Sequence, residues 1–238
     1  MILNICFALI LILGTFLSYI PQFYKIIKYK NSAGISNLMI FFNVFSSTLS
    51  LIGVFSDNSS CNSTDNCIIN LLAIFQIITP WFFSLFYYFL YLFYFIPSKK
   101  ITFSLKKYQI KYYVSFCFII NIITFLIIIL SKYLNFKNEI FNSIFTFFAG
   151  FFSILMFLPQ IFETYLNKNI YNLSILSLSM HCTGCILCSI YIIFFTNSYF
   201  LVSIPYILSF LLELILICMS FYYYHQKKNS INELLINE

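Results

Sequence analysis

Ser18-Tyr-Ile-Pro-Gln-Phe-Tyr-Lys25 lies inside the first long apolar segment of the chain, and a similar stretch, Met156-Phe-Leu-Pro-Gln-Ile-Phe-Glu163, lies inside a later one. A short turn follows each stretch at the same interval, Lys30-Asn-Ser-Ala-Gly-Ile-Ser36 and Lys168-Asn-Ile-Tyr-Asn-Leu-Ser174. An internal repeat of this size predicts two copies of one structural unit. In a membrane protein such copies usually enclose a pathway at their interface.

The composition excludes a water-soluble globular protein, because 61% of the residues are hydrophobic and only 8% are charged. Several apolar segments reach the roughly 20 residues that cross a bilayer as a helix. The predicted spans are residues 3–25, 36–56, 68–95, 111–131, 140–163, 173–196 and 199–224. A cleaved signal peptide is the alternative for the first segment, but that segment lacks a basic start and carries the first Pro-Gln.

The lysines predict the orientation of these spans. With the N-terminus on the luminal side and the C-terminus in the cytosol, eleven of the 13 basic residues fall at cytosolic ends. Only Lys132 and Lys137 fall on the opposite side, as the positive-inside rule requires. The net charge of +6 therefore reflects topology, and we expect lipid but no nucleic acid as a partner.

A polar loop after the second span should face the lumen. It contains two glycosylation sequons, at Asn58 and Asn62, which are either used or present by chance. Cys61 and Cys67 flank the second sequon, and the two thiols are candidates for a disulfide in an oxidising compartment.

The spans predict an all-α integral membrane protein with seven transmembrane helices. Residues 3–95 form the first three-helix repeat and residues 140–224 the second. Between them, residues 96–139 supply a basic cytosolic loop, a linker helix and a luminal loop, and residues 225–238 form a cytosolic tail. The single linker helix gives both repeats the same orientation, so the arrangement is a parallel repeat joined as 3+1+3.

The paired Pro-Gln dipeptides and the turns that follow them resemble those of the PQ-loop repeat family. The first turn matches the family pattern best, and the second departs from it at Ile170 and Asn172. The family includes cystinosin and lysosomal basic amino acid exporters, and it is related in fold to the SWEET sugar transporters and the KDEL receptors. The resemblance implies a lysosomal or other endomembrane location. Its members carry cystine, amino acids or sugars, and some have no known cargo.

The prolines are candidate hinges. A proline inside a helix removes a backbone donor and clashes with the carbonyl four residues earlier, which favours either a moving hinge or a static kink. Pro80 and Pro205 repeat the pattern in the third helix of each repeat. The predicted hinge residues are Pro21, Gln22, Pro159 and Gln160.

Four polar residues inside the spans are candidates for a substrate or proton site. Glu213 is the only acidic residue deep in a span, and intramembrane carboxylates usually face a cavity or a relay. With one gap allowed, Gln76 takes the same place in the first repeat. His181 and Asn43 also correspond, each 22 residues after its Pro of the Pro-Gln pair. For each of them, a hydrogen bond that only serves helix packing is the alternative.

Two further sets of residues have a weaker pattern. Lys25 and Glu163 correspond in the two repeats and form a candidate ionic gate at the cytosolic mouth, or else two solvated charges. The thiols of Cys182, Cys185 and Cys188 have a spacing that resembles a metal-binding run, but small residues packing in an apolar helix explain them better. We expect no metal and no cofactor.

Two functions remain open. The first is a secondary transporter of a small organic solute, such as an amino acid or cystine, coupled to protons and working by alternating access. The second is a non-transporting membrane protein that acts as a receptor or scaffold, or in the use of lipid-linked sugars. An intramembrane enzyme is not expected, because no paired acids, nucleophile with a base, or His/Glu metal motif is present. The sequence does not determine the oligomeric state.

Overall fold

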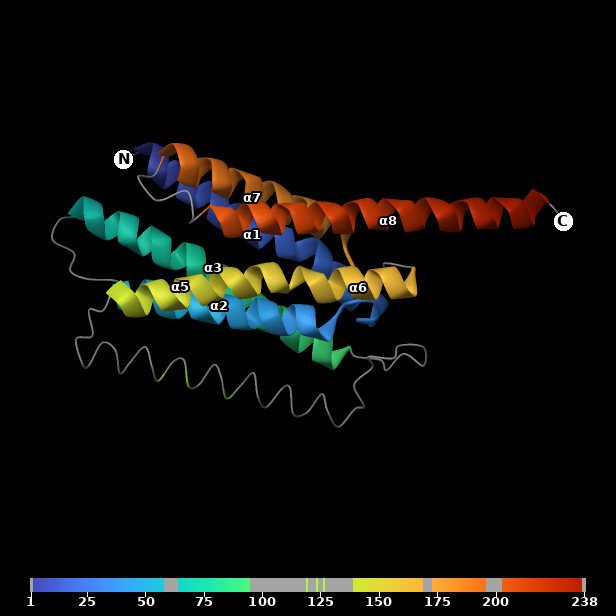
Figure 1. Ribbon diagram of the computed structural model, residues 1–238, viewed down its shortest axis with the longest axis horizontal. Helices are drawn as coiled ribbons and strands as arrows, with labels where there is room; N and C mark the ends of the chain where they lie inside the picture. The colour runs from blue at the N-terminus through green and yellow to red at the C-terminus, as the bar shows by residue number, and fades with distance from the viewer. Residues whose placement is uncertain are drawn as a thin grey trace.

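The apolar segments fold as helices because a bilayer offers no water to unpaired backbone groups, and a helix bonds these groups within itself. The computed structural model describes residues 2–57, 64–94, 119, 123, 126, 139–168, 173–195 and 203–236. Figure 1 shows the arrangement of the helices. They are α1 (Ile2–Tyr29), α2 (Asn37–Asp57), α3 (Thr64–Phe93), α5 (Glu139–Leu155), α6 (Phe157–Asn167), α7 (Ile175–Phe195) and α8 (Ile204–Ile236).

Six of the seven predicted spans coincide with a helix, α5 and α6 together making one of them. Four stretches in the described residues are long and apolar enough to cross a membrane: Ile5–Tyr29, Ile74–Phe93, Ser143–Asn167 and Ile204–Gln226. The predicted linker at 111–131 lies outside the described residues except at three isolated positions, so the seven-helix arrangement stays a prediction. Asn58, Asn62 and Cys61 also lie outside the described residues.

Pro159 acts on its helix as predicted. The α5 helix ends at Leu155, the residue whose carbonyl the proline ring displaces, and α6 begins at Phe157. In the first repeat, α1 continues through Pro21 without a break.

The prediction of a proline kink inside the last helix is wrong for Pro205. This residue is the second in α8, and the backbone N–H groups of Tyr206 and Ile207 both donate to the carbonyl of Ser203 at 3.1 Å. Proline in a first turn removes no intrahelical hydrogen bond, so it bends nothing there. α8 also continues twelve residues past the predicted end of its span at 224, and its last turns extend beyond the other helices (Figure 1).

The helices form a closed ring of six neighbours. In the first repeat α1 and α2 both pack on α3, and in the second repeat α7 and the α5–α6 pair both pack on α8. The repeats meet along two seams, α1 against α7 and α2 against α5. Figure 1 shows α2 lying along α5. Each repeat therefore places its third helix between the other two.

The α2/α5 seam is apolar and closely packed. Leu49, Ile52 and Ala149 form a buried cluster there, and Phe45 packs edge-on against Phe152 with ring centroids 4.7 Å apart. The Ser46 hydroxyl donates to the carbonyl of Ala149 at 2.8 Å. Small residues allow this close approach of two helices, as is common in membranes.

Gly150 fixes the approach of α5 to α8. A Cβ added at Gly150 would lie 2.9 Å from Cγ of Pro205, and a proline ring cannot rotate away. We therefore expect Gly150→Ala to lower the free energy of unfolding by about 1–3 kcal/mol. The measurement is the thermal stability of the purified protein in detergent.

Gly14→Ala is the matched control, because nothing lies within 4 Å of a Cβ at that position of α1. Replacing a helical glycine by alanine in open space should leave stability unchanged or raise it by about 0.5–1 kcal/mol. Equal unfolding temperatures for the two variants would contradict the close contact of α5 with α8.

Candidate functional site

The two repeats share one local structure at the end of their Pro-Gln helices. Pro21 and Pro159 stand 138 positions apart, and so do Lys30 and Lys168. Both lysines have left-handed backbone angles, with φ of 47° and 49°, which end the preceding helix. The chain then turns and enters the second helix of each repeat.

Each Pro-Gln glutamine reaches across to the turn of the other repeat. The Oε1 atom of Gln160 accepts a hydrogen bond from the backbone N–H of Ser36 at 2.7 Å, and its Nε2 donates to the carbonyl of Gly34 at 2.8 Å. The Oε1 atom of Gln22 accepts from the backbone N–H of Ser174, also at 2.7 Å. We call these two reciprocal contacts the amide clasps.

The clasps give hydrogen-bond partners to backbone groups that find no water in a membrane. The first N–H groups at the start of a helix have no intrahelical acceptor, and an unpaired one is costly where water is absent. A glutamine side chain supplies both an acceptor and donors. Both side chains are buried, Gln22 at 3% exposure and Gln160 at 0%. From the sequence we expected these glutamines only as parts of hinges. Their contacts between the repeats were not predicted.

Two further hydrogen bonds join α1 to the second repeat beside the clasps. The ammonium of Lys25 donates to the carbonyl of Leu173 at 2.7 Å, and the Ser177 hydroxyl donates to the carbonyl of Ser18. The carboxylate of Glu163 instead accepts from Asn167 on its own helix at 3.4 Å. The structure therefore does not bring Lys25 and Glu163 together, and no ion pair joins them within the described residues.

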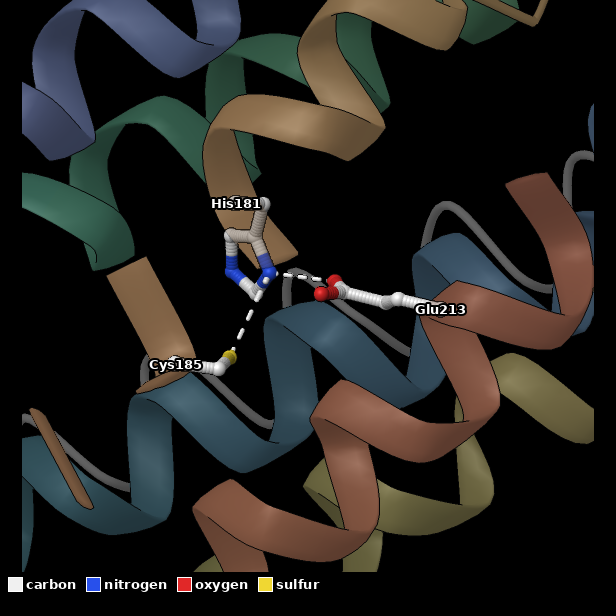
Figure 2. Close-up of side chains that lie close together, drawn as sticks. All are labelled: His181, Cys185 and Glu213. Carbon is white, nitrogen blue, oxygen red and sulfur yellow. Dashed lines mark hydrogen bonds and ion pairs between the residues drawn. The ribbon is translucent and has the colours of Figure 1, made fainter. Parts of the chain in front are cut away.

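The second group of polar side chains lies on α7 and α8. The imidazole Nδ1 of His181 bonds the Oε1 atom of Glu213, and the sulfur of Cys185 lies 3.8 Å from the same nitrogen. Figure 2 shows the three side chains pointing toward one another. The Glu213 side chain is only 1% exposed, whereas that of His181 is 40% exposed. The other oxygen of Glu213, Oε2, is buried and has no hydrogen-bond partner among the described residues.

The first repeat adds two side chains near this pair. The hydroxyl of Tyr19 on α1 is hydrogen-bonded to the side chain of Asn43 on α2. It also lies within electrostatic range of His181 and Glu213. The first repeat therefore lies near the pair on α7 and α8, through α1, which packs on α7. Sequence reasoning missed Tyr19, although its place three residues before Gln22, inside the repeated motif, was a usable signal.

Gln76 lies on α3, which packs on α1 and α2. No ion pair or hydrogen bond between side chains joins it to Glu213 within the described residues. That these two side chains face each other across the repeat axis stays a prediction.

A ring contact connects the Pro159 break to His181. Phe157, the first residue of α6, is 1% exposed, and its ring centroid lies 6.3 Å from that of His181.

Comparison with known families agrees with this geometry. The family model described as the PQ loop repeat matches residues 3–63 and 141–201, which together make up half of the chain. The chain belongs to the PQ-loop repeat family. The two matched stretches begin 138 positions apart, the register that also relates the two amide clasps. The family resemblance found in the sequence is thus confirmed.

The PQ-loop fold of this chain is similar to a solved structure, the 3.7 Å resolution structure of a eukaryotic SWEET transporter. The similarity covers 94% of this chain and 99% of the other, with a TM-score of 0.56 and 15% sequence identity. At this identity the likeness shows the fold alone. No curated protein matches the chain.

The clasps predict a specific effect of Gln160→Leu. The substitution leaves the N–H of Ser36 and the carbonyl of Gly34 buried without their partner, which costs about 1–3 kcal/mol for each group. We expect a lower unfolding temperature and faster amide hydrogen exchange at residues 34–36, measured by mass spectrometry on the purified protein.

Gln226→Leu serves as the control, because Gln226 is exposed on α8, far along the chain from both turns. It should leave exchange at residues 34–36 unchanged. If Gln160→Leu also left that exchange unchanged, the clasp would contribute nothing to holding the turn.

Proposed function

We propose that this PQ-loop protein is a secondary transporter of a small organic solute, such as an amino acid or cystine, coupled to protons and working by alternating access. The observation that supports it most is the His181–Glu213 pair, which lies where helices of both repeats meet. Ionisable side chains inside a membrane are costly, and they usually serve an ion or substrate pathway.

Glu213 is the proton-binding group in this proposal, and His181 is its partner. The opposite charges of an imidazolium and a carboxylate offset each other at this buried place. A proton taken up by Glu213 neutralises the carboxylate and leaves the half-buried imidazolium without its counter-charge, which is unfavourable. The helices reduce this cost by rearranging, and proton binding is thereby coupled to a change of conformation.

The neighbouring groups suit a solute that carries an amino group. The Oε2 atom of Glu213 accepts no hydrogen bond from the described residues, so an ammonium group of the solute can bind it. The side chains of Tyr19 and Asn43 offer neutral donors and acceptors nearby. A carboxylate at the centre favours an amino acid or cystine over an uncharged sugar.

The two seams have different roles in the proposed motion. The α2/α5 seam is apolar and closely packed, and it acts as the pivot. The α1/α7 seam is joined at one end by a few hydrogen bonds, among them the Gln22–Ser174 contact and Ser177 to Ser18, and it is the seam that opens. Near its other end, the rings of Phe7 and Tyr191 stack 4.3 Å apart and close the opposite mouth.

The proposed orientation places the clasped end of the bundle in the cytosol. Lys25, Lys28, Lys30 and Lys168 lie at the clasped end, which the positive-inside rule assigns to the cytosol. In an endolysosomal membrane, protons would move down their gradient from the lumen to the cytosol. The solute would be carried in the same direction, from the lumen into the cytosol.

The test is uptake of radiolabelled amino acids and cystine by proteoliposomes that contain the purified protein under an imposed proton gradient. The variant Glu213→Gln keeps the shape of the side chain but binds no proton, so proton-driven flux should fall to that of empty liposomes. Glu233→Gln, near the end of α8 and outside the site, should retain the flux.

Both variants must elute as folded protein in size-exclusion chromatography, so that a loss of flux reports on transport alone. Proton-driven flux of wild-type magnitude in Glu213→Gln would exclude this carboxylate as the coupling group. The absence of flux for every solute with the wild-type protein would argue for the non-transporting alternative.

A further inference from the structure

We infer that His181, Cys185 and Glu213 form a binding site for a divalent metal ion of the Zn²⁺ class. The three residues each offer one ligand atom, and these atoms lie within 4.8 Å of one another. His181 and Cys185 are four residues apart on α7, so they lie on one face of the helix, one turn apart. Glu213 completes the group from α8 (Figure 2).

The spacing between the imidazole nitrogen and the sulfur is close to that in a tetrahedral site. A zinc ion binds imidazole nitrogen at about 2.0 Å and thiolate sulfur at about 2.3 Å, which places the two ligand atoms roughly 3.5 Å apart in a tetrahedron. The Nδ1 of His181 and the sulfur of Cys185 are 3.8 Å apart. The ion would take the place of the proton that Nδ1 and the Oε1 atom of Glu213 share.

A second observation points to a missing ligand at the same place. The Oε2 atom of Glu213 is buried without a hydrogen-bond partner among the described residues, although buried carboxylate oxygens are normally bonded. The nearby Phe157 ring carries no polar group that could bond this oxygen. A cation bound through both oxygens of the carboxylate would supply the missing partner.

The chemistry of the donors selects the class of metal. Imidazole and thiolate together favour zinc and similar transition metals over Mg²⁺ and Ca²⁺, which prefer oxygen ligands alone. Three protein ligands leave one position for water or a solute, and the 40% exposure of His181 keeps that position accessible.

The site has a consequence for transport that rests on the proposed function. The same atoms of His181 and Glu213 hold the metal ion and the transported proton. A bound Zn²⁺ therefore competes with the proton and blocks its exchange. Zinc should therefore inhibit proton-driven flux.

The test uses the full-length protein in detergent and Co²⁺ as a spectroscopic substitute for Zn²⁺. Co²⁺ should give the charge-transfer absorption of a thiolate–metal bond, and added Zn²⁺ should remove it by displacement. Cys185→Ser should lose this absorption and bind Zn²⁺ at least 10–100-fold more weakly, a loss typical even of residues that only support a metal ligand. His181→Gln should weaken Zn²⁺ binding similarly.

Cys188→Ser is the matched control, since Cys188 is on the same helix but outside the group of ligand atoms. It should keep both the absorption and the affinity. Equal spectra for Cys185→Ser and the wild-type protein, or no thiolate absorption at all, would overturn the metal site. A protein that binds Co²⁺ through Cys185 but moves no solute supports the site while it removes the transport proposal.

Discussion

Two buried glutamine amides hold the repeats together at one end of the bundle, and the geometry of the rest follows from them. A bilayer supplies no water to the N–H groups that begin α2 and α7, so the protein must supply their acceptors. Gln160 does so for Ser36 and Gln22 for Ser174, each from the opposite repeat. Each glutamine thus supplies a hydrogen-bond acceptor to a backbone N–H and also joins the two repeats.

The clasps lie on the same helices as the central group. Tyr19 precedes Gln22 by less than one turn of α1, and Phe157 precedes Gln160 in α6. Tyr19 lies within electrostatic range of His181 and Glu213, and the ring of Phe157 lies near the imidazole of His181. The clasps and the groups near the His181–Glu213 pair are therefore carried by the same helices, α1 and α6.

Most of the fold could be predicted from the sequence, because bilayer thickness sets the length of a spanning helix. The ends of six predicted spans lie within a few residues of the ends of the observed helices, except at the end of α8. It also singled out His181 and Glu213, since polar groups are costly in a membrane. The partners of these side chains were harder to predict. Lys25 binds the carbonyl of Leu173 rather than Glu163, because a backbone acceptor lies within its reach. The grouping of Cys185 with Glu213 depends on how α7 packs on α8, which helical spacing alone does not give.

The proposed transport requires the α1/α7 seam to open while each repeat moves as a unit. Spin labels at Lys28 on α1 and Leu176 on α7, both exposed, report on the seam when their separation is measured by pulsed electron spin resonance. A pair at Tyr29 and Phe93 reports on the first repeat alone. We expect acidification in the presence of solute to shift the Lys28–Leu176 distance distribution between two populations. The Tyr29–Phe93 distribution should stay unchanged. A Lys28–Leu176 distribution that does not change under conditions of active transport would exclude opening of this seam.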